Sequence, residues 1–201
     1  MEKPVITISR QFAAMGRTIA QKLARMLDIE FMDRDIVEEA AKRMNISLKE
    51  ASSRDEEAGS GSFFMRRSYL FNFGVYNLTT ELFETEKSII RDWAEKGNCI
   101  IVGRLAEDIL RKRPNTLRAY IYAPFDDRVA NCVEKLQIGN EEEAVRDIKR
   151  VDAARTAFRR KFAHSEPGPE NFDVMLSSSA FGIDGCAEIL SEMARRRLRW
   201  D

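Results

Sequence analysis

The sequence predicts an α/β fold with three layers, in which a parallel sheet of about five strands carries helices on both faces. Short apolar runs rich in β-branched residues alternate with longer segments whose apolar residues recur at helical spacing. That order is typical of a parallel sheet whose strands are joined by helices. A chain of 201 residues is long enough for one such domain, so residues 1–201 are interpreted as a single domain.

Five runs are predicted to be strands, of which residues 4–8 and 99–102 have the continuous apolar character of strands that are buried on both faces of a sheet. The five runs are residues 4–8, 29–32, 99–102, 117–123 and 172–176. Ligands bind beyond the carboxyl ends of the strands in such sheets. Charged residues follow the first three strands, where a phosphate and metal site would need them: Arg10, Asp33, Arg34 and Arg104.

Helical periodicity predicts the segments that cover the sheet. The predicted helices are residues 16–27, a helix opened by 33–35, 63–95 with an interruption near Gly74, 105–112, a helix from 124, 140–163 as one helix or two, and 183–198. Residues 52–62 and 165–171 are predicted to be loops, and residues 177–179 a turn. The aromatic run at 63–83 is interpreted as a hydrophobic cap on the core. A base-stacking surface and a homo-oligomer interface are the alternatives.

Composition excludes several classes of function. Lys plus Arg and Asp plus Glu each number 33, so the formal net charge is zero, whereas nucleic-acid and membrane binders usually have a basic excess. His164 is the single histidine, so neither a histidine triad nor a zinc site is expected. Cys99, Cys132 and Cys186 lie far apart, as unpaired thiols of a reducing compartment do. Without a signal peptide or a run of about 20 apolar residues, the protein is expected to be cytoplasmic.

The segment between the first strand and the first helix has the layout of a phosphate-binding loop. Backbone N–H groups and a helix N-terminus favour an anion at such a place. Against the motif G-x-x-x-x-G-K-[ST], Gly16 and Thr18 match, while Gln11 replaces the first glycine and Arg17 the lysine. Because a non-glycine residue in left-handed geometry costs about 1–2 kcal/mol, the loop near Gln11 is expected to have a different shape. An ordinary strand–turn–helix is the alternative interpretation.

Five segments together resemble the cytidylate kinase-like branch of P-loop nucleoside monophosphate kinases. They are ITISRQFAAMGRTIAQKLA (6–24), FMDRDIVEEAA (31–41), IIVGRLAEDIL (100–110), RVDAARTAFRRKFA (150–163) and NFDVMLSSSAFGIDGCAEIL (171–190). The resemblance implies the P-loop kinase fold and ATP- and Mg²⁺-dependent phosphoryl transfer to a nucleoside monophosphate, CMP or dCMP. Two small residues usually precede the loop glycine in this branch, so Met15 is a bulky departure.

The resemblance also implies residue roles. The ATP phosphates would be held by Ser9, Arg10, Gln11, Ala13, Ala14, Met15, Gly16, Arg17 and Thr18, with Thr18 also on Mg²⁺. The acceptor would be bound by Asp33, Arg34 and Arg104, beside a helical insert at 46–95. An arginine-rich lid at 140–168 would contribute Arg150, Asp152, Arg155, Arg159 and Arg160. The catalytic residues would be Arg17, Arg155 and Arg159.

The residues of the lid support that role independently. Arg155 and Arg159 are four apart and therefore share one helix face, and phosphoryl transfer needs positive charge around the moving group. A solvated basic helix that pairs with Glu141–Glu143 is the alternative. Two other functions stay open, a nucleotide-binding regulatory protein without catalysis and a kinase for another small acceptor. Either way, the expected partners are small-molecule nucleotides, not nucleic acid or membrane.

Overall fold

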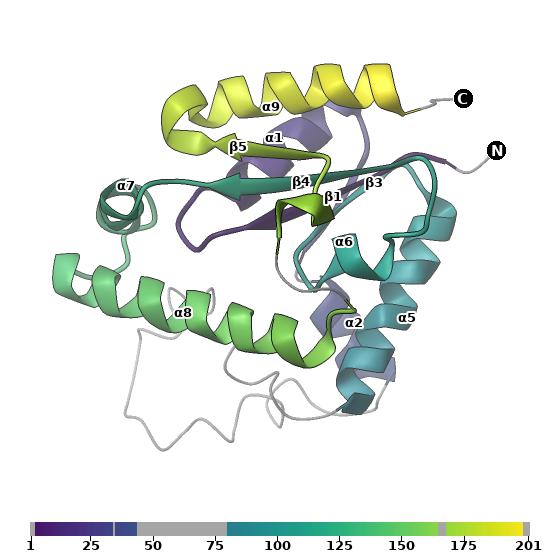
Figure 1. Ribbon diagram of the computed structural model, residues 1–201, viewed down its shortest axis with the longest axis horizontal. Coiled ribbons are helices and arrows are strands. Elements are labelled where there is room, and N and C mark those ends of the chain that lie inside the picture. The colour runs from purple at the N-terminus through teal and green to yellow at the C-terminus, as the bar shows by residue number, and fades with distance from the viewer. Residues whose placement is uncertain (1–2, 34, 44–79, 165–167, 199–201) are drawn as a thin grey trace.

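The computed structural model describes residues 3–33, 35–43, 80–164 and 168–198 (Figure 1). Its centre is a sheet of five parallel strands in the order β2-β3-β1-β4-β5. The strands are β1 Val5–Arg10, β2 Glu30–Met32, β3 Cys99–Val102, β4 Thr116–Tyr122 and β5 Val174–Ser177. The predicted α/β fold with a parallel sheet is confirmed.

Helices cover both faces of this sheet (Figure 1). α1 Gly16–Leu27 and α9 Ser178–Arg197 pack on one face, and α2 Asp35–Arg43, α5 Thr80–Lys96 and α6 Ala106–Ile109 lie on the other. The segment between β4 and β5 holds the remaining elements: α7 Phe125–Ala130, the π-helical turn η3 Asn131–Lys135, α8 Glu141–Phe162 and the 3₁₀ turn η4 Pro169–Asn171. None of the described helices is long and apolar enough to cross a membrane.

Alternation along β1 divides the core into two layers. Ile6 and Ile8 point toward α1 and α9 and are fully buried there, whereas Val5 packs among α2, α5 and α6. Each of the three free cysteines is buried in a different cluster: Cys186 within α9, Cys132 within η3 beside α8, and Cys99 at the start of β3. The two core layers therefore pack against both faces of β1, the central strand that ends at Arg10.

Some predicted boundaries were wrong for local reasons. The helix expected at 105–112 is the short α6, because Pro114 follows closely and disfavours continuation. The turn expected at 177–179 is instead the junction of β5 and α9: Ser177 ends the strand, and its hydroxyl accepts a hydrogen bond from Ala180 N and caps the helix that begins at Ser178. Gly182 then leaves helical geometry at φ 67°, so the predicted start at 183 marks a kink.

Other predictions on the connecting segments have mixed outcomes. Residues 140–163 form the single helix α8, which begins with a capping box between Asn140 and Glu143. The predicted loop at 165–171 contains the turn η4. The loop at 52–62 and most of the aromatic run at 63–83 and of the insert at 46–95 lie outside the described residues. Within α5, Phe83 is buried against Phe158 of α8.

Asp173, which the sequence placed inside the last strand, lies just before β5 and joins it to β4. Its carboxylate accepts hydrogen bonds from Arg118 N at 2.8 Å and from the Arg118 guanidinium at 3.1 and 3.2 Å. Burial alone would raise the pKa of Asp173, but these hydrogen bonds outweigh it and lower the pKa below the ordinary value of 3.8. Asp173 therefore has a structural role.

We expect Asp173→Asn to lower the free energy of unfolding at neutral pH by about 1.5–3 kcal/mol, the range for hydrogen bonds to a charged group. Because the folded-state pKa is lowered, this stabilisation is present above the unfolded-state pKa and is lost as the pH falls through the folded-state value. Urea unfolding at neutral pH and at about pH 2.5 tests this. A difference between wild type and variant that stays the same at both pH values would contradict it.

Candidate active site

The loop between β1 and α1 has an unusual backbone. Ala13 and Met15 have left-handed φ values of 60° and 59°, although neither is glycine. The backbone of Gln11 itself is not left-handed, in line with the different loop shape expected near this residue. Gln11 instead ties the loop to the end of β4: its N–H donates to Ile121 O at 3.0 Å, and its Oε1 accepts from Ala123 N at 3.0 Å.

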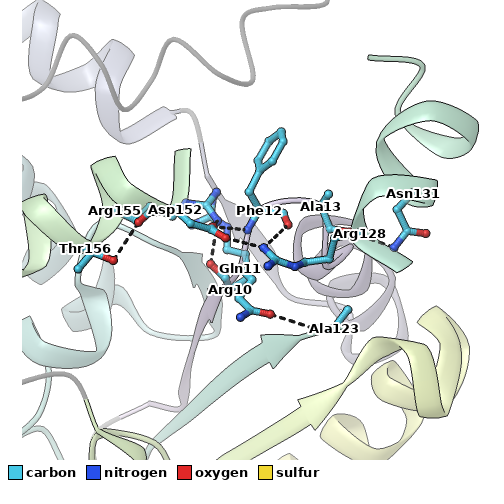
Figure 2. A network of polar contacts seen from close by, with 10 residues as sticks. All are labelled: Arg10, Gln11, Phe12, Ala13, Ala123, Arg128, Asn131, Asp152, Arg155 and Thr156. Carbon is cyan, nitrogen blue, oxygen red and sulfur yellow. Dashed lines mark hydrogen bonds and ion pairs between the residues drawn. The ribbon is translucent and has the colours of Figure 1, made fainter. Parts of the chain in front are cut away.

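A polar network from the segment after β4 holds this loop (Figure 2). Arg128 Nη1 donates to Phe12 O at 3.4 Å, and Asn131 Nδ2 donates to Ala13 O at 3.0 Å. Asp152 Oδ1 accepts from Phe12 N at 2.9 Å, and its other oxygen pairs with Arg128 at 2.5 Å. Contacts of this kind allow left-handed non-glycine residues to persist, because they over-determine the backbone around them.

The N-terminus of α1 is suited to an anion. In this fully described helix, no side chain caps the first turn, and the turn contains Arg17 and no acidic residue. The first intrahelical N–H bond is from Ile19 to Met15 O, so the amides of Gly16, Arg17 and Thr18 precede the helical ladder. A Cβ at Gly16 would lie 2.7 Å from Arg10 Cβ, which explains the glycine at this position.

Asp33, predicted on the acceptor side, joins two arginines that flank the loop, Arg10 at the end of β1 and Arg17 in α1. It lies 2.5 Å from Arg17 Nε and 3.6 Å from Arg10 Nη2. Burial lowers the pKa of Arg10, and the Asp33 charge opposes that shift. A Cβ at Gly103 would collide with the Arg10 guanidinium. Arg10 is thus fixed between the ends of β1, β2 and β3.

Arg104 and Arg159 are each paired with a buried carboxylate. Arg104 Nη1 lies 3.5 Å from Glu86 of α5, a residue that is 1% exposed. Burial raises the pKa of Glu86, and the Arg104 charge partly offsets this. Arg159 pairs with Glu107 of α6 at 2.5 Å, and Glu107 also accepts a hydrogen bond from Ser9 Oγ at 2.8 Å. These pairs orient the two guanidinium groups.

The predicted lid is α8, and only part of the predicted set turns toward the loop. Arg155 Nη1 donates to Arg10 O at 2.8 Å, and burial, with the nearby Arg10 charge, lowers the pKa of Arg155 to about 9. Arg155 and Arg159 share a face, as the spacing predicted. By contrast, Arg150 and Arg160 are exposed, and Arg150 pairs with Asp147. Neither lines the site.

The alternative interpretation of α8, a solvated basic helix that pairs with Glu141–Glu143, applies only to the first turns of this helix. Arg146 pairs with Glu142, one turn before it, and both side chains are well exposed. Arg155 and Arg159 find their partners on β1, α6 and their own helix instead. Arg155 and Arg159, in the second half of α8, are therefore not part of a solvated charge stripe.

A cavity of about 630 Å³ lies between the loop side of the sheet and α8. Its charged and polar lining consists of Ser9, Arg10, Gln11, Arg104, Glu107, Asp152, Arg155, Thr156 and Arg159. Arg34, predicted on the acceptor side, lies outside the described residues. A more open hollow between α2 and α5 lies away from the loop.

Sequence reasoning missed three polar residues of this site. Arg128 and Asn131 have no motif around them, and only the fold brings them to the loop. Glu107 had a weak signal, since it lies three residues after Arg104 in a segment that follows a strand. A buried acid was the natural partner for a nearby arginine.

Comparisons with known proteins agree with this fold. A model of the cytidylate kinase-like family matches residues 5–180. The chain is similar to the crystal structure of an uncharacterized protein from Eubacterium ventriosum, with 20% identity and a TM-score of 0.72 over 97% of this chain and 100% of that chain. A shikimate kinase from Bacteroides thetaiotaomicron has 14% identity and a TM-score of 0.55 over 96% and 98% of the two chains.

An unliganded sugar kinase from Janibacter sp. is similar at 16% identity, with a TM-score of 0.54 over 97% of this chain and 94% of that chain. At these identities, the likeness to solved structures concerns the fold alone. No curated protein matches the chain.

Proposed function

The chain belongs to the cytidylate kinase-like family, and we propose that it transfers the γ-phosphoryl group of ATP to a nucleoside monophosphate, CMP or dCMP. One observation supports the proposal most directly. The N-terminus of α1, which is suited to an anion, lies beside a cavity that is lined by Arg10, Arg104, Arg155 and Arg159. Phosphoryl transfer of this kind requires positioned positive charge and little covalent chemistry. A cytoplasmic location stays a prediction.

The proposed division of labour follows from position. The loop amides, with Arg17, bind the phosphates of ATP, because they precede the hydrogen-bond ladder of α1. Arg104 binds the acceptor phosphate from the end of β3. Arg155 and Arg159 reach the cavity from α8 and neutralise charge on the transferring group, while α8 excludes water.

Mg²⁺ fits this site as an ion that is shared between a protein oxygen and the substrate phosphates. Among the described residues, no group of three His, Cys, Asp or Glu side chains could hold a metal by itself. Mg²⁺ commonly binds through one or two protein oxygens together with substrate phosphates. The Thr18 hydroxyl, in the first turn of α1, is the protein oxygen that we assign to it, and the ion supplies neutralisation of phosphate charge.

The test is an ADP-release assay with ATP, Mg²⁺ and each common nucleoside monophosphate, for wild type and for Arg159→Ala. We expect turnover with CMP or dCMP and its loss in the variant. Arg146→Ala is the matched control on the same helix, because its side chain is 64% exposed and pairs only with Glu142 among described residues. Its turnover should equal that of wild type.

A thermal-shift panel separates the proposal from the non-catalytic alternative. Nucleotide at ten times its Kd stabilises a folded protein by about 1.4 kcal/mol. Stabilisation by ATP without turnover on any monophosphate would favour a regulatory nucleotide-binding protein. If no nucleotide stabilises the protein and no monophosphate is turned over, nucleotide binding at this site is refuted.

A further inference from the structure

The loop between β1 and α1 alternates in backbone handedness, which is the pattern of an anion-binding hollow. Ala13 and Met15 are left-handed, at φ 60° and 59°, whereas Ala14 between them and Gly16 after them are not. Such alternation turns the backbone N–H groups of neighbouring residues toward one common point. Among the described residues, the amides of Ala13, Met15 and Gly16 make no backbone hydrogen bond. The left-handed residues therefore determine whether these amides can bind a phosphate together.

The residue type at position 13 does not favour this shape. Glycine adopts left-handed geometry at no steric cost, whereas the Cβ of alanine is penalised there. The Ala13 side chain is 6% exposed and packs in one cluster with Val129 of α7, Cys132 of η3 and Ile148 of α8. The loop is thus built into the segment that follows β4, and its shape depends on contacts from that segment.

Asn131 makes the contact that fixes this residue (Figure 2). Its Nδ2 donates to Ala13 O at 3.0 Å, and the whole residue is only 8% exposed. Because a carbonyl oxygen can only accept, the NH₂ group of Asn131, and not its oxygen, faces the loop. Without this hydrogen bond, nothing would hold the Ala13 carbonyl against the intrinsic preference of alanine for other conformations.

The segment after β4 presents two such donors on one face. Arg128 and Asn131 are three residues apart, in α7 and at the start of η3, and residues at this spacing face the same way. Arg128 Nη1 donates to Phe12 O at 3.4 Å, the carbonyl just before that of Ala13. Arg128 also pairs with Asp152, whereas Asn131 carries no charge. Replacing Asn131 therefore tests the loop without leaving a buried charge unpaired.

We propose that Asn131 is a positioning residue for the donor phosphates: it holds Ala13 in the left-handed geometry that the phosphate loop needs, in place of a glycine at that position. The inference rests on the proposed function, in which the loop binds the phosphates of ATP. Asn131 is not assigned a contact with ATP, because its amide group is directed at the loop carbonyl. It acts only through the shape of the backbone.

Calorimetric titration of Asn131→Ala with ATP and Mg²⁺, without an acceptor, tests this role. If the loop relaxes in the free variant, ATP must restore left-handed geometry at Ala13 in order to bind, which lowers its apparent affinity. The steric penalty corresponds to a rise in Kd of about 5- to 30-fold. Val133→Ala, in the same turn but at a position that is 36% exposed, is the matched control and should bind ATP like wild type.

A second substitution separates positioning from a general loss of structure. Ala13→Gly in the Asn131→Ala background should return Kd to within about threefold of wild type, because glycine adopts left-handed geometry without help. Ala14→Gly makes the same change at a residue that is not left-handed, so it should not restore the affinity. Since either glycine removes a buried methyl group, neither double variant should melt at a higher temperature than Asn131→Ala. Affinity that recovers without a gain in stability is the result expected of a positioning residue.

The outcomes of the titration distinguish this inference from the kinase proposal. If wild type binds ATP and Asn131→Ala binds it equally well, Asn131 is not a positioning residue, and the kinase proposal stands. Recovery by both glycines or by neither would also overturn the inference, because the loss would then not arise from the geometry of Ala13. If wild type does not bind ATP, the proposed function fails, and the inference fails with it.

Discussion

Replacing Asp152 with alanine is expected to lower the free energy of unfolding by about 3 kcal/mol. The change removes the acceptor of Phe12 N and leaves the Arg128 side chain, which is 8% exposed, without its carboxylate. Breaking a buried ion pair costs about 3–5 kcal/mol, and we expect the lower end because the Asp152 side chain is 30% exposed. Urea unfolding of variant and wild type measures the difference.

Two further variants sharpen this prediction. Asp152→Asn keeps an oxygen for Phe12 N but loses the charge, so its destabilisation should be smaller. Glu142→Ala, on the same helix, removes a carboxylate that is 83% exposed and should change stability by less than about 0.5 kcal/mol. A loss in Asp152→Ala no larger than that of Glu142→Ala would show that the network does not hold the loop.

Arg155→Ala is expected to lower kcat of the proposed kinase by about 10³-fold or more. An arginine that stabilises charge in phosphoryl transfer contributes about 10³–10⁵ to kcat, and Arg155 both lines the cavity and donates to Arg10 O. Initial rates at saturating ATP and acceptor measure the loss.

Arg155→Lys should restore only part of that rate, because an ammonium group cannot reproduce the planar pattern of donors of a guanidinium. Arg146→Ala again serves as the control on α8. Circular dichroism establishes that the variants are folded. A kcat for Arg155→Ala within tenfold of wild type would assign Arg155 a structural role.

The sequence was most informative where local pattern alone determines structure. The run CIIV corresponds residue for residue to β3, and the helix predicted at 16–27 is α1. Continuous burial makes such strands apolar throughout, and amphipathic periodicity marks a helix that packs on a sheet. Both patterns depend on neighbours in the chain and can therefore be seen without the fold.

The shape of the phosphate loop depends on residues distant in sequence. Ala13 has a left-handed backbone although its type disfavours it, and Asn131, which holds its carbonyl, is 118 residues away. No local propensity contains that information. Tyr120 and Tyr122 also line the cavity. The sequence did not predict this, because a largely apolar strand does not reveal which of its residues line a cavity.

The predicted lid, α8, shows within one helix both what the sequence could predict and what it could not. Helical spacing grouped Arg155 with Arg159 correctly, because residues four apart share a face. The same spacing places Arg150 and Arg160 on other faces, and both are exposed. The resemblance had assigned all four arginines to one lid, and helical periodicity separates those that line the cavity from those that are exposed.

The three cysteines provide the chain with internal reporters of local opening. Burial raises the pKa of Cys99 to about 12 and that of Cys132 to about 11, so neither forms a thiolate readily at neutral pH. Alkylation of each thiol must wait until its own cluster separates. Mass-spectrometric labelling kinetics would thus yield three independent opening rates, one for each layer of the molecule and one for the packing between loop and α8.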